Sequence, residues 1–211
     1  MDTDPKSRSL ILASQSPRRR YLLEQAGLTF EVVPSRIDEG QFDLTSPVQY
    51  VRRLAEAKST DVAKIYAHAW VIGADTVVLI DGTVLGKPAD RQDARAMLQR
   101  LSGRTHQVYT GYNICCRRKA WSFSDAIVTD VTFKTLSEDE IEWYIHTTEP
   151  FDKAGGYAIQ GLGTFLVRRI NGSYTNVVGL PVCEVIEVLV KLGVAGLERR
   201  KVGQRSRLRG S

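Results

Sequence analysis

The sequence predicts an α/β protein with a mixed, strongly curved sheet and flanking helices. Long strand-like runs lie at residues 69–80, 106–116 and 122–136. Helix starts fall between some of these runs but not all, unlike the regular strand–helix alternation of a parallel sheet. The Asp81-Gly82 dipeptide is a strong β-hairpin signal and predicts an antiparallel pair after the first run. The other expected strands are 9–14, 29–35, 83–87 and 164–170, with turns at 117–119 and 171–172.

Each expected helix begins at a local capping signal. Ser16 before Pro17 predicts a helix over 17–26 that ends at Gly27, because serine caps the first turn and proline fits the first helical position. The other starts are Ser46-Pro47 for a helix through about residue 65, Asp90 for one ending at Ser102-Gly103, a Ser137/Glu140 capping box for residues 138–147, and Pro181 for a last helix to about residue 192.

The chain's length suits one α/β domain, or two small lobes around a cleft, because 211 residues can bury a sizeable core. Its net charge of +5 lies in residues 198–211, where six arginines and lysines accompany one glutamate, so the rest is formally neutral. We therefore expect a domain over 9–197 between a flexible N-terminus, 1–8, and a disordered basic tail, with no specific nucleic-acid partner. A tail that binds nucleic acid or an acidic membrane is the alternative.

Cysteine and histidine usage argues against several kinds of site. Cys115 and Cys116 are adjacent, the third cysteine is remote, and no C-x-x-C or histidine ligand spacing occurs, so we predict neither disulfides nor a zinc site. The sequence has no run of 18 apolar residues and no signal-peptide core. We therefore expect a cytoplasmic protein without a membrane partner.

Three arginines, Arg18 to Arg20, lie in the first turn of the first predicted helix, where the helix dipole disfavours cations by roughly 0.3–1 kcal/mol each. The strand–loop–helix segment around Ser14 and Ser16 is typical of an anion site, because backbone N–H groups converge there. Arginine also matches phosphate oxygens in a bidentate manner. The pattern favours a phosphate site, with arginines that simply point into solvent as the alternative.

Four other charged residues stand out against their local patterns. Lys58 extends the apolar stripe of its helix, so it either snorkels to solvent or reaches into a pocket. Asp75 interrupts a buried strand, which is unfavourable unless a cation, metal or hydrogen-bond donor meets it. Lys87 follows a glycine after the hairpin, and Glu39 lies just past a strand end. Two carboxylates, several cations and a helix N-terminus suit a metal-bound polyphosphate.

Distinctive motifs cover nearly the whole chain, from about residue 9 to 192. In order they are LASQSPRR, IDEG, LAEAKS, GADTVV, GKP, LSGRTHQVYTGY, EPFDKAGGYAIQG, INGSY and VVGLP. Through these motifs the chain resembles the Maf family, the nucleoside triphosphate pyrophosphatases also called septum-formation inhibitors.

The resemblance implies an inosine-triphosphatase-like fold with two lobes and a central nucleotide cleft. It implies hydrolysis of a nucleoside triphosphate to the monophosphate and pyrophosphate with the help of a divalent cation. The expected cation is Mg²⁺, and Mn²⁺ or Co²⁺ are the alternatives. Asp75 corresponds to the proton acceptor and, with Glu39, to the metal-associated positions. The positions that correspond to phosphate-binding residues are Ser14, Arg19, Lys58 and Lys87.

Three positions bear on which nucleotide base the substrate carries. Arg18, Thr76 and Gln160 match the subfamily that acts on dTTP and UTP, whereas the methylated-guanine subfamily has an aromatic residue after the proline and a glutamate in place of Gln160. A glutamine amide has both a donor and an acceptor for the N3–H and carbonyls of uracil or thymine. The alternatives are the same chemistry on 7-methyl-GTP or another base, and a non-catalytic nucleotide-binding regulator of division. The sequence does not decide the oligomeric state, and a homodimer is one option.

Overall fold

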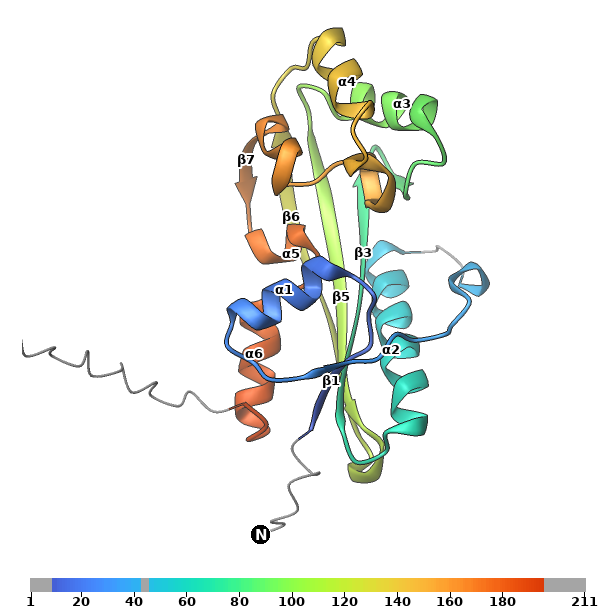
Figure 1. Ribbon diagram of the computed structural model, residues 1–211, viewed down its shortest axis with the longest axis vertical. Helices are drawn as coiled ribbons and strands as arrows, with labels where there is room; N and C mark the ends of the chain where they lie inside the picture. The colour runs from blue at the N-terminus through green and yellow to red at the C-terminus, as the bar shows by residue number, and fades with distance from the viewer. Residues whose placement is uncertain (1–8, 43–45, 196–211) are drawn as a thin grey trace, which may run out of the picture.

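Three long strands form the spine of the molecule, in a computed structural model that describes residues 9–42 and 46–195. Antiparallel strands β3 (Trp70–Ile80), β5 (Thr105–Cys116) and β6 (Trp121–Phe133) run along most of its long axis and twist around one another (Figure 1). The sheet is mixed, as predicted, because it combines parallel and antiparallel neighbours. The parallel neighbours are β1 (Leu10–Leu12) and β2 (Glu31–Val32), and the remaining antiparallel strands are β4 (Thr83–Leu85) and β7 (Val167–Asn171).

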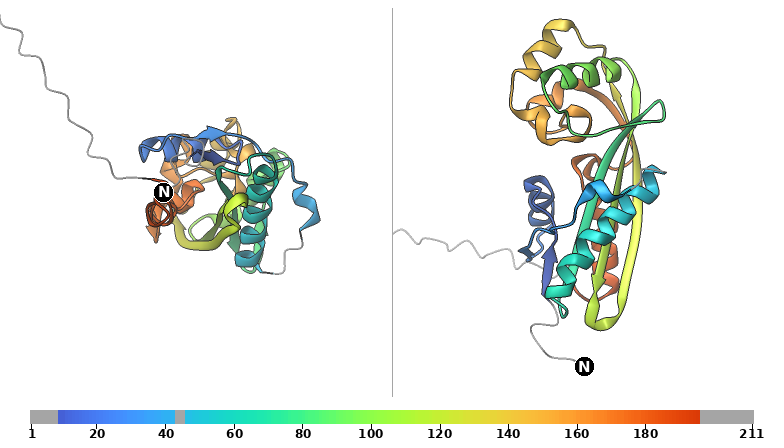
Figure 2. Two further views of the ribbon diagram at one scale, coloured as in Figure 1. Left: turned by 90° about the horizontal axis from the view of Figure 1, so that it is seen from below. Right: turned by 90° about the vertical axis from the view of Figure 1, so that its right-hand side faces the viewer.

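Helices cover the sheet in two lobes, which Figure 2 shows side-on with the long strands joining them. In one lobe, side chains of β1 alternate between two apolar clusters, one beneath α1 (Pro17–Gln25) and α6 (Val182–Lys191), the other beneath α2 (Pro47–Ile65). Cys115 and Cys116 likewise enter opposite clusters. The other lobe has its own cluster, to which α3 (Arg91–Leu101) and α4 (Glu138–Ile145) contribute.

Two glycines allow α2 to lie directly on the sheet. A Cβ atom on Gly73 of β3 would be 2.1 Å from the carbonyl oxygen of Ala55, and one on Gly111 of β5 would be 2.4 Å from that of Val51. Any side chain at either position would therefore force the helix away. This close approach brings Lys58 of α2 over the middle of β3.

The local signals predicted most element starts correctly. Ser16 accepts a hydrogen bond from Arg19 N, Asp90 accepts one from Asp93 N, and Ser137 with Glu140 forms the predicted capping box. The hairpin is also confirmed.

Some strands were predicted with the wrong length, because the predictions rested on composition and not on whether a neighbouring strand was available to pair with them. The expected strand 29–35 shortens to Glu31–Val32, and β7 begins at Val167 because the preceding residues form the 3₁₀ helix η6 (Gly161–Leu166). The five-residue helix α5 (Tyr174–Val178) was not predicted. The terminal segments expected at 1–8 and 198–211 lie outside the described residues. Over the described ranges, no helix has the length and hydropathy that crossing a bilayer requires.

Candidate active site

A cavity of about 620 Å³ lies between the two lobes. Every residue that the resemblance assigned to the site lines this cavity, although these residues come from separate segments of the chain. They are Ser14, Arg18, Arg19, Glu39, Lys58, Asp75, Thr76, Lys87 and Gln160.

Arg19 lies in the cavity wall, where it is held by protein groups. Its Nε donates to Gly179 O at 2.7 Å, and its two terminal nitrogens donate to Ser14 Oγ at 3.3 Å and Thr76 Oγ1 at 3.1 Å. Burial lowers the pKa of Arg19, while the charge of Asp75 acts in the opposite direction. The guanidinium is thus fixed in place as a cation of the cavity.

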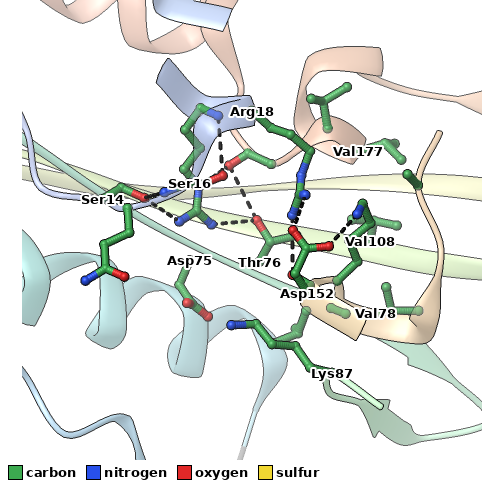
Figure 3. A pocket seen from close by; sticks show the side chains of 18 of the residues that line it. Ser14, Ser16, Arg18, Asp75, Thr76, Val78, Lys87, Val108, Asp152 and Val177 are labelled. Atoms are coloured by element: carbon green, nitrogen blue, oxygen red, sulfur yellow. Dashed lines mark hydrogen bonds and ion pairs between the residues drawn. The ribbon is translucent and has the colours of Figure 1, made fainter. Parts of the chain in front are cut away.

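The other two arginines of the same turn go elsewhere. Arg18 spans the cavity to Asp152 on the 3₁₀ helix η4 (Glu149–Asp152), with Nη1 2.9 Å from Oδ2 (Figure 3). Arg20 pairs with Glu24 on the exposed face of α1 at 2.7 Å. Two of the three arginines therefore face the cavity, and the solvent alternative holds for Arg20 alone.

Lys58 joins the two predicted acidic residues. Its Nζ is 2.7 Å from Asp75 Oδ1 and 2.8 Å from Glu39 Oε1. Lys58 is 7% exposed and Asp75 8%, so the snorkelling alternative is wrong and the lysine reaches into the pocket. Burial raises the pKa of Glu39, but the hydrogen bond and charge of Lys58, with Lys87 and Arg19, bring it below its ordinary value.

The side chains of Lys87 and Gln160 remain available to a ligand in the cavity. Lys87 points across the open space toward Asp75 (Figure 3). Among the described residues, none forms an ion pair with Lys87 or a hydrogen bond with the Gln160 side-chain amide. Both groups can therefore meet a ligand without breaking a contact within the protein.

Thr76, by contrast, is already engaged. Its hydroxyl receives the Arg19 hydrogen bond and also lies 2.9 Å from Thr110 Oγ1 and 3.4 Å from Gly179 O. In this geometry Thr76 acts on the cavity by holding Arg19, because its hydroxyl accepts from Arg19 and has its single proton directed to Thr110 or Gly179 within the protein.

The structure adds cavity residues to which the sequence analysis assigned no role. Asp152 and Lys153 form a charged pair within the glycine-rich EPFDKAGG motif, and that unusual placement was the available signal. Tyr50 lies on α2, and its pKa is raised by burial and by the charges of Asp75 and Glu39. Nothing in its local sequence distinguished it.

Tyr157 forms another part of the wall, supported from behind by a buried histidine. Its hydroxyl is 2.7 Å from Nε2 of His106, and the two rings meet edge to face. Burial lowers the pKa of His106 to about 4, so the imidazole is neutral at physiological pH. His106 therefore has a structural role here, in agreement with its lack of ligand spacing.

The donor set suits a divalent cation that is shared with a substrate. The Asp75 and Glu39 carboxylates meet at one ammonium group, so they lie around a common point and offer hard oxygen ligands. The described ranges hold no group of three or more histidine, cysteine, aspartate or glutamate residues that could bind a metal. Mg²⁺ characteristically binds through one or two carboxylates plus phosphate oxygens, so the residues fit this mode.

Several known proteins are similar to this chain. A dTTP/UTP pyrophosphatase from Syntrophus aciditrophicus is 50% identical over 184 residues, which cover 87% of this chain and 90% of that protein. A dTTP/UTP pyrophosphatase from Bacillus pumilus is 48% identical over 185 residues, 88% of this chain and 97% of that protein. A solved HAM1 protein from Coxiella burnetii superimposes with a TM-score of 0.42 at 17% identity, over 59% of this chain and 72% of that one.

The family match extends over almost all of the described chain. Residues 9–192 match the family described as Maf-like protein, and this range includes both lobes and every cavity residue named above. With the motifs in order, charged residues from several of those motifs gathered in one cavity, and relatives of about 50% identity, this chain belongs to the Maf family.

Proposed function

We propose that this protein hydrolyses dTTP and UTP between the α- and β-phosphates, releasing the nucleoside monophosphate and pyrophosphate in the cytoplasm. The observation that carries the proposal is the Asp75–Lys58–Glu39 cluster in a cavity also lined by Arg19 and Lys87. A cavity of about 620 Å³ is within the usual range for ligands of nucleotide size. The relatives named dTTP/UTP pyrophosphatases support the choice of base.

Asp75 is the proposed proton acceptor. Water attacks the α-phosphorus and its proton passes to the Asp75 carboxylate. The bond between the α- and β-phosphates breaks, with pyrophosphate as the leaving group. Lys58 holds the Asp75 carboxylate in place through an ion pair of 2.7 Å, and the same ammonium group also pairs with Glu39. Charge builds on the phosphate oxygens during this step, and Arg19 and Lys87 are the cations placed to stabilise it.

Asp75 and Glu39 are also the residues that would hold the divalent cation, together with the triphosphate. When bound, such an ion neutralises charge on the phosphate oxygens. Mg²⁺ is proposed first, because its preference for carboxylate and phosphate oxygens matches this donor set.

Gln160 and Arg18 are proposed to recognise the base side of the nucleotide. Gln160 presents an amide with no partner among the described residues, and Arg18 reaches across the cavity mouth to Asp152. Thr76 contributes by holding Arg19 in place.

The test of the function is pyrophosphate release from a panel of canonical and modified nucleoside triphosphates, with Mg²⁺ or Mn²⁺. We expect kcat/KM to be highest for dTTP and UTP and activity to disappear with a chelator. A protein that prefers 7-methyl-GTP would keep the chemistry and overturn the base assignment. One that binds nucleotides but releases no pyrophosphate would support the regulatory alternative.

Gln160→Glu is expected to lower kcat/KM for UTP about tenfold or more. The carboxylate lacks the amide's donor and repels the uracil carbonyls, and an unpaired polar group costs roughly 1–3 kcal/mol. The measurement is the ratio of kcat/KM for UTP to that for GTP and 7-methyl-GTP, in wild type and variant. Glu24→Gln, on the exposed face of α1, is the control for a change in surface charge and should leave the ratio unchanged. An unchanged ratio in Gln160→Glu would remove Gln160 from base recognition.

A further inference from the structure

The turn that carries Gln160 is attached to a hydrogen-bonded pair of side chains, Tyr144 and Glu149. Tyr144 comes from α4 and is fully buried, whereas Glu149 begins η4 and is half-buried. The Tyr144 hydroxyl donates to Glu149 Oε1 at 2.8 Å. This pair lies outside the group of residues that line the cavity, so the mechanism above does not use it.

The pair holds the backbone on both sides of Gln160. Before it in sequence, Ala158 N donates to the Tyr144 hydroxyl at 3.1 Å. After it, Leu162 N donates to Glu149 Oε2 at 3.0 Å and Gly163 N donates to Glu149 Oε1 at 2.7 Å. Three amides within two or three residues of Gln160 thus converge on two side chains.

Two glycines allow the turn to lie so close to this pair. Gly161 has a φ of +76°, and a Cβ atom there would be 2.4 Å from Glu149 Oε2. A Cβ atom on Gly163 would be 2.7 Å from the Tyr144 hydroxyl and 2.4 Å from Ala158 O. The backbone is therefore in direct contact with the pair, with no room for a side chain between them.

The chemistry of the Tyr144 hydroxyl fits a permanent contact with Glu149. The Tyr144 hydroxyl donates its one proton to Glu149 and accepts from Ala158, so its bonding capacity is largely used. Burial, followed by the hydrogen bond to Glu149, raises the pKa of Tyr144, which keeps the hydroxyl protonated at physiological pH.

A fixed backbone matters for a glutamine that reads a base. An amide can turn either its oxygen or its nitrogen toward a ring, so it pairs with uracil or, after a flip, with cytosine. Selection of one base requires that the amide be held at a fixed place against the ring, and this depends on the rigidity of the turn that carries it.

We propose that Tyr144 and Glu149 are positioning residues for base selection, which hold the Gln160 turn against the nucleotide and so allow uracil to be distinguished from cytosine. The inference rests on the proposed function, in which Gln160 contacts the base.

The test compares Tyr144→Phe and Glu149→Gln with Tyr109→Phe. Tyr109 is a suitable control because its hydroxyl makes a hydrogen bond of 2.7 Å to Gln107 on β5, and it does not line the cavity. The first measurement is amide hydrogen exchange over residues 157–163 without any nucleotide. We expect exchange at Ala158 to be about fivefold to tenfold faster in Tyr144→Phe, from the loss of one hydrogen bond, and unchanged in the control.

The second measurement is the ratio of kcat/KM for UTP to that for CTP. We expect it to fall about fivefold or more in Tyr144→Phe and Glu149→Gln, mainly through a higher KM for UTP. In a Gln160→Ala background, the further change Tyr144→Phe should leave the ratio within about twofold, because the effect passes through Gln160. Glu149→Gln alters a half-buried residue at the start of the short helix η4, so it tests the proposal even if Tyr144→Phe does not fold.

Each contrary result has a separate meaning. Unchanged exchange in both variants would overturn the attachment of the turn. Faster exchange with an unchanged UTP:CTP ratio, or equal losses for both nucleotides, would overturn its role in base selection. A wild-type protein that releases no pyrophosphate from UTP would refute the proposed function instead, and the exchange measurement would still decide whether the pair holds the turn.

Discussion

We expect Asp75→Asn to lower pyrophosphate release by about 10²–10⁴-fold while the protein remains folded, because the amide keeps the shape of the carboxylate but cannot accept the proton. The fold should persist because Lys58 retains Glu39 as a partner at 2.8 Å, so no buried charge is left alone. The measurement is kcat for UTP with Mg²⁺, together with thermal unfolding of the same sample.

Asp130→Asn is the matched control for this change. Asp130 lies on β6, where its Oδ1 accepts a hydrogen bond from Gln107 at 3.2 Å, and it does not line the cavity. The control should keep its activity. Turnover close to wild type in folded Asp75→Asn would show that another group accepts the proton.

Lys58→Met is expected to have the second-largest effect, a loss of activity on the order of 10²-fold, since removal of a preorganised charged group has effects of this size. Without the ammonium group, Asp75 and Glu39 lose the cation that both contact, and the two carboxylates repel each other. Lys58 lowers the pKa of Glu39, so without the lysine that pKa rises and Glu39 binds a proton at a higher pH than before. The acid limb of the kcat/KM profile should move to higher pH.

Lys87→Ala is the informative comparison. Lys87 also faces the cavity, but it forms no ion pair within the described residues, so its removal should reduce kcat/KM with a much smaller displacement of the acid limb. Lys87→Ala should unfold close to the wild-type temperature, because Lys87 forms no ion pair within the described residues. Lys58→Met should unfold at a lower temperature, because it leaves the buried Asp75 carboxylate without its cation. If Lys58→Met unfolds the protein yet keeps full activity per folded molecule, Lys58 is structural.

Local sequence signals predicted those parts of the fold that depend on neighbouring residues. The Ser16-Pro17 start, the Ser137/Glu140 capping box and the Asp81-Gly82 turn each satisfy backbone groups within a few residues, and all three are present. Asp81 and Gly82 both have positive φ, as a tight hairpin turn requires.

Elements stabilised by distant partners were missed or misplaced. The helix α5 has only five residues and is held by Asn176, whose amide donates to Val108 O at 3.1 Å and Thr129 Oγ1 at 2.9 Å. A helix so short has little stability of its own, so its sequence carries no periodic signal. The start of β7 likewise depended on how much of β6 was free to pair with it.

The sequence alone determined the family of the protein, through its motifs, and predicted the residues of the candidate site. A carboxylate in a buried strand is unfavourable without a partner, so Asp75 stood out as a candidate before its contact with Lys58 was known. Lys58 stayed open between snorkelling and a pocket until the family resemblance assigned it to the site. Only the tertiary structure decided which groups meet. It separated the three neighbouring arginines into a cavity cation, a partner of Asp152 and a surface ion pair. It also connected Tyr144 and Glu149 to the turn of Gln160. The reason is that burial and local patterns act on single positions, whereas hydrogen bonds and ion pairs depend on how strands and helices far apart in the chain are packed together.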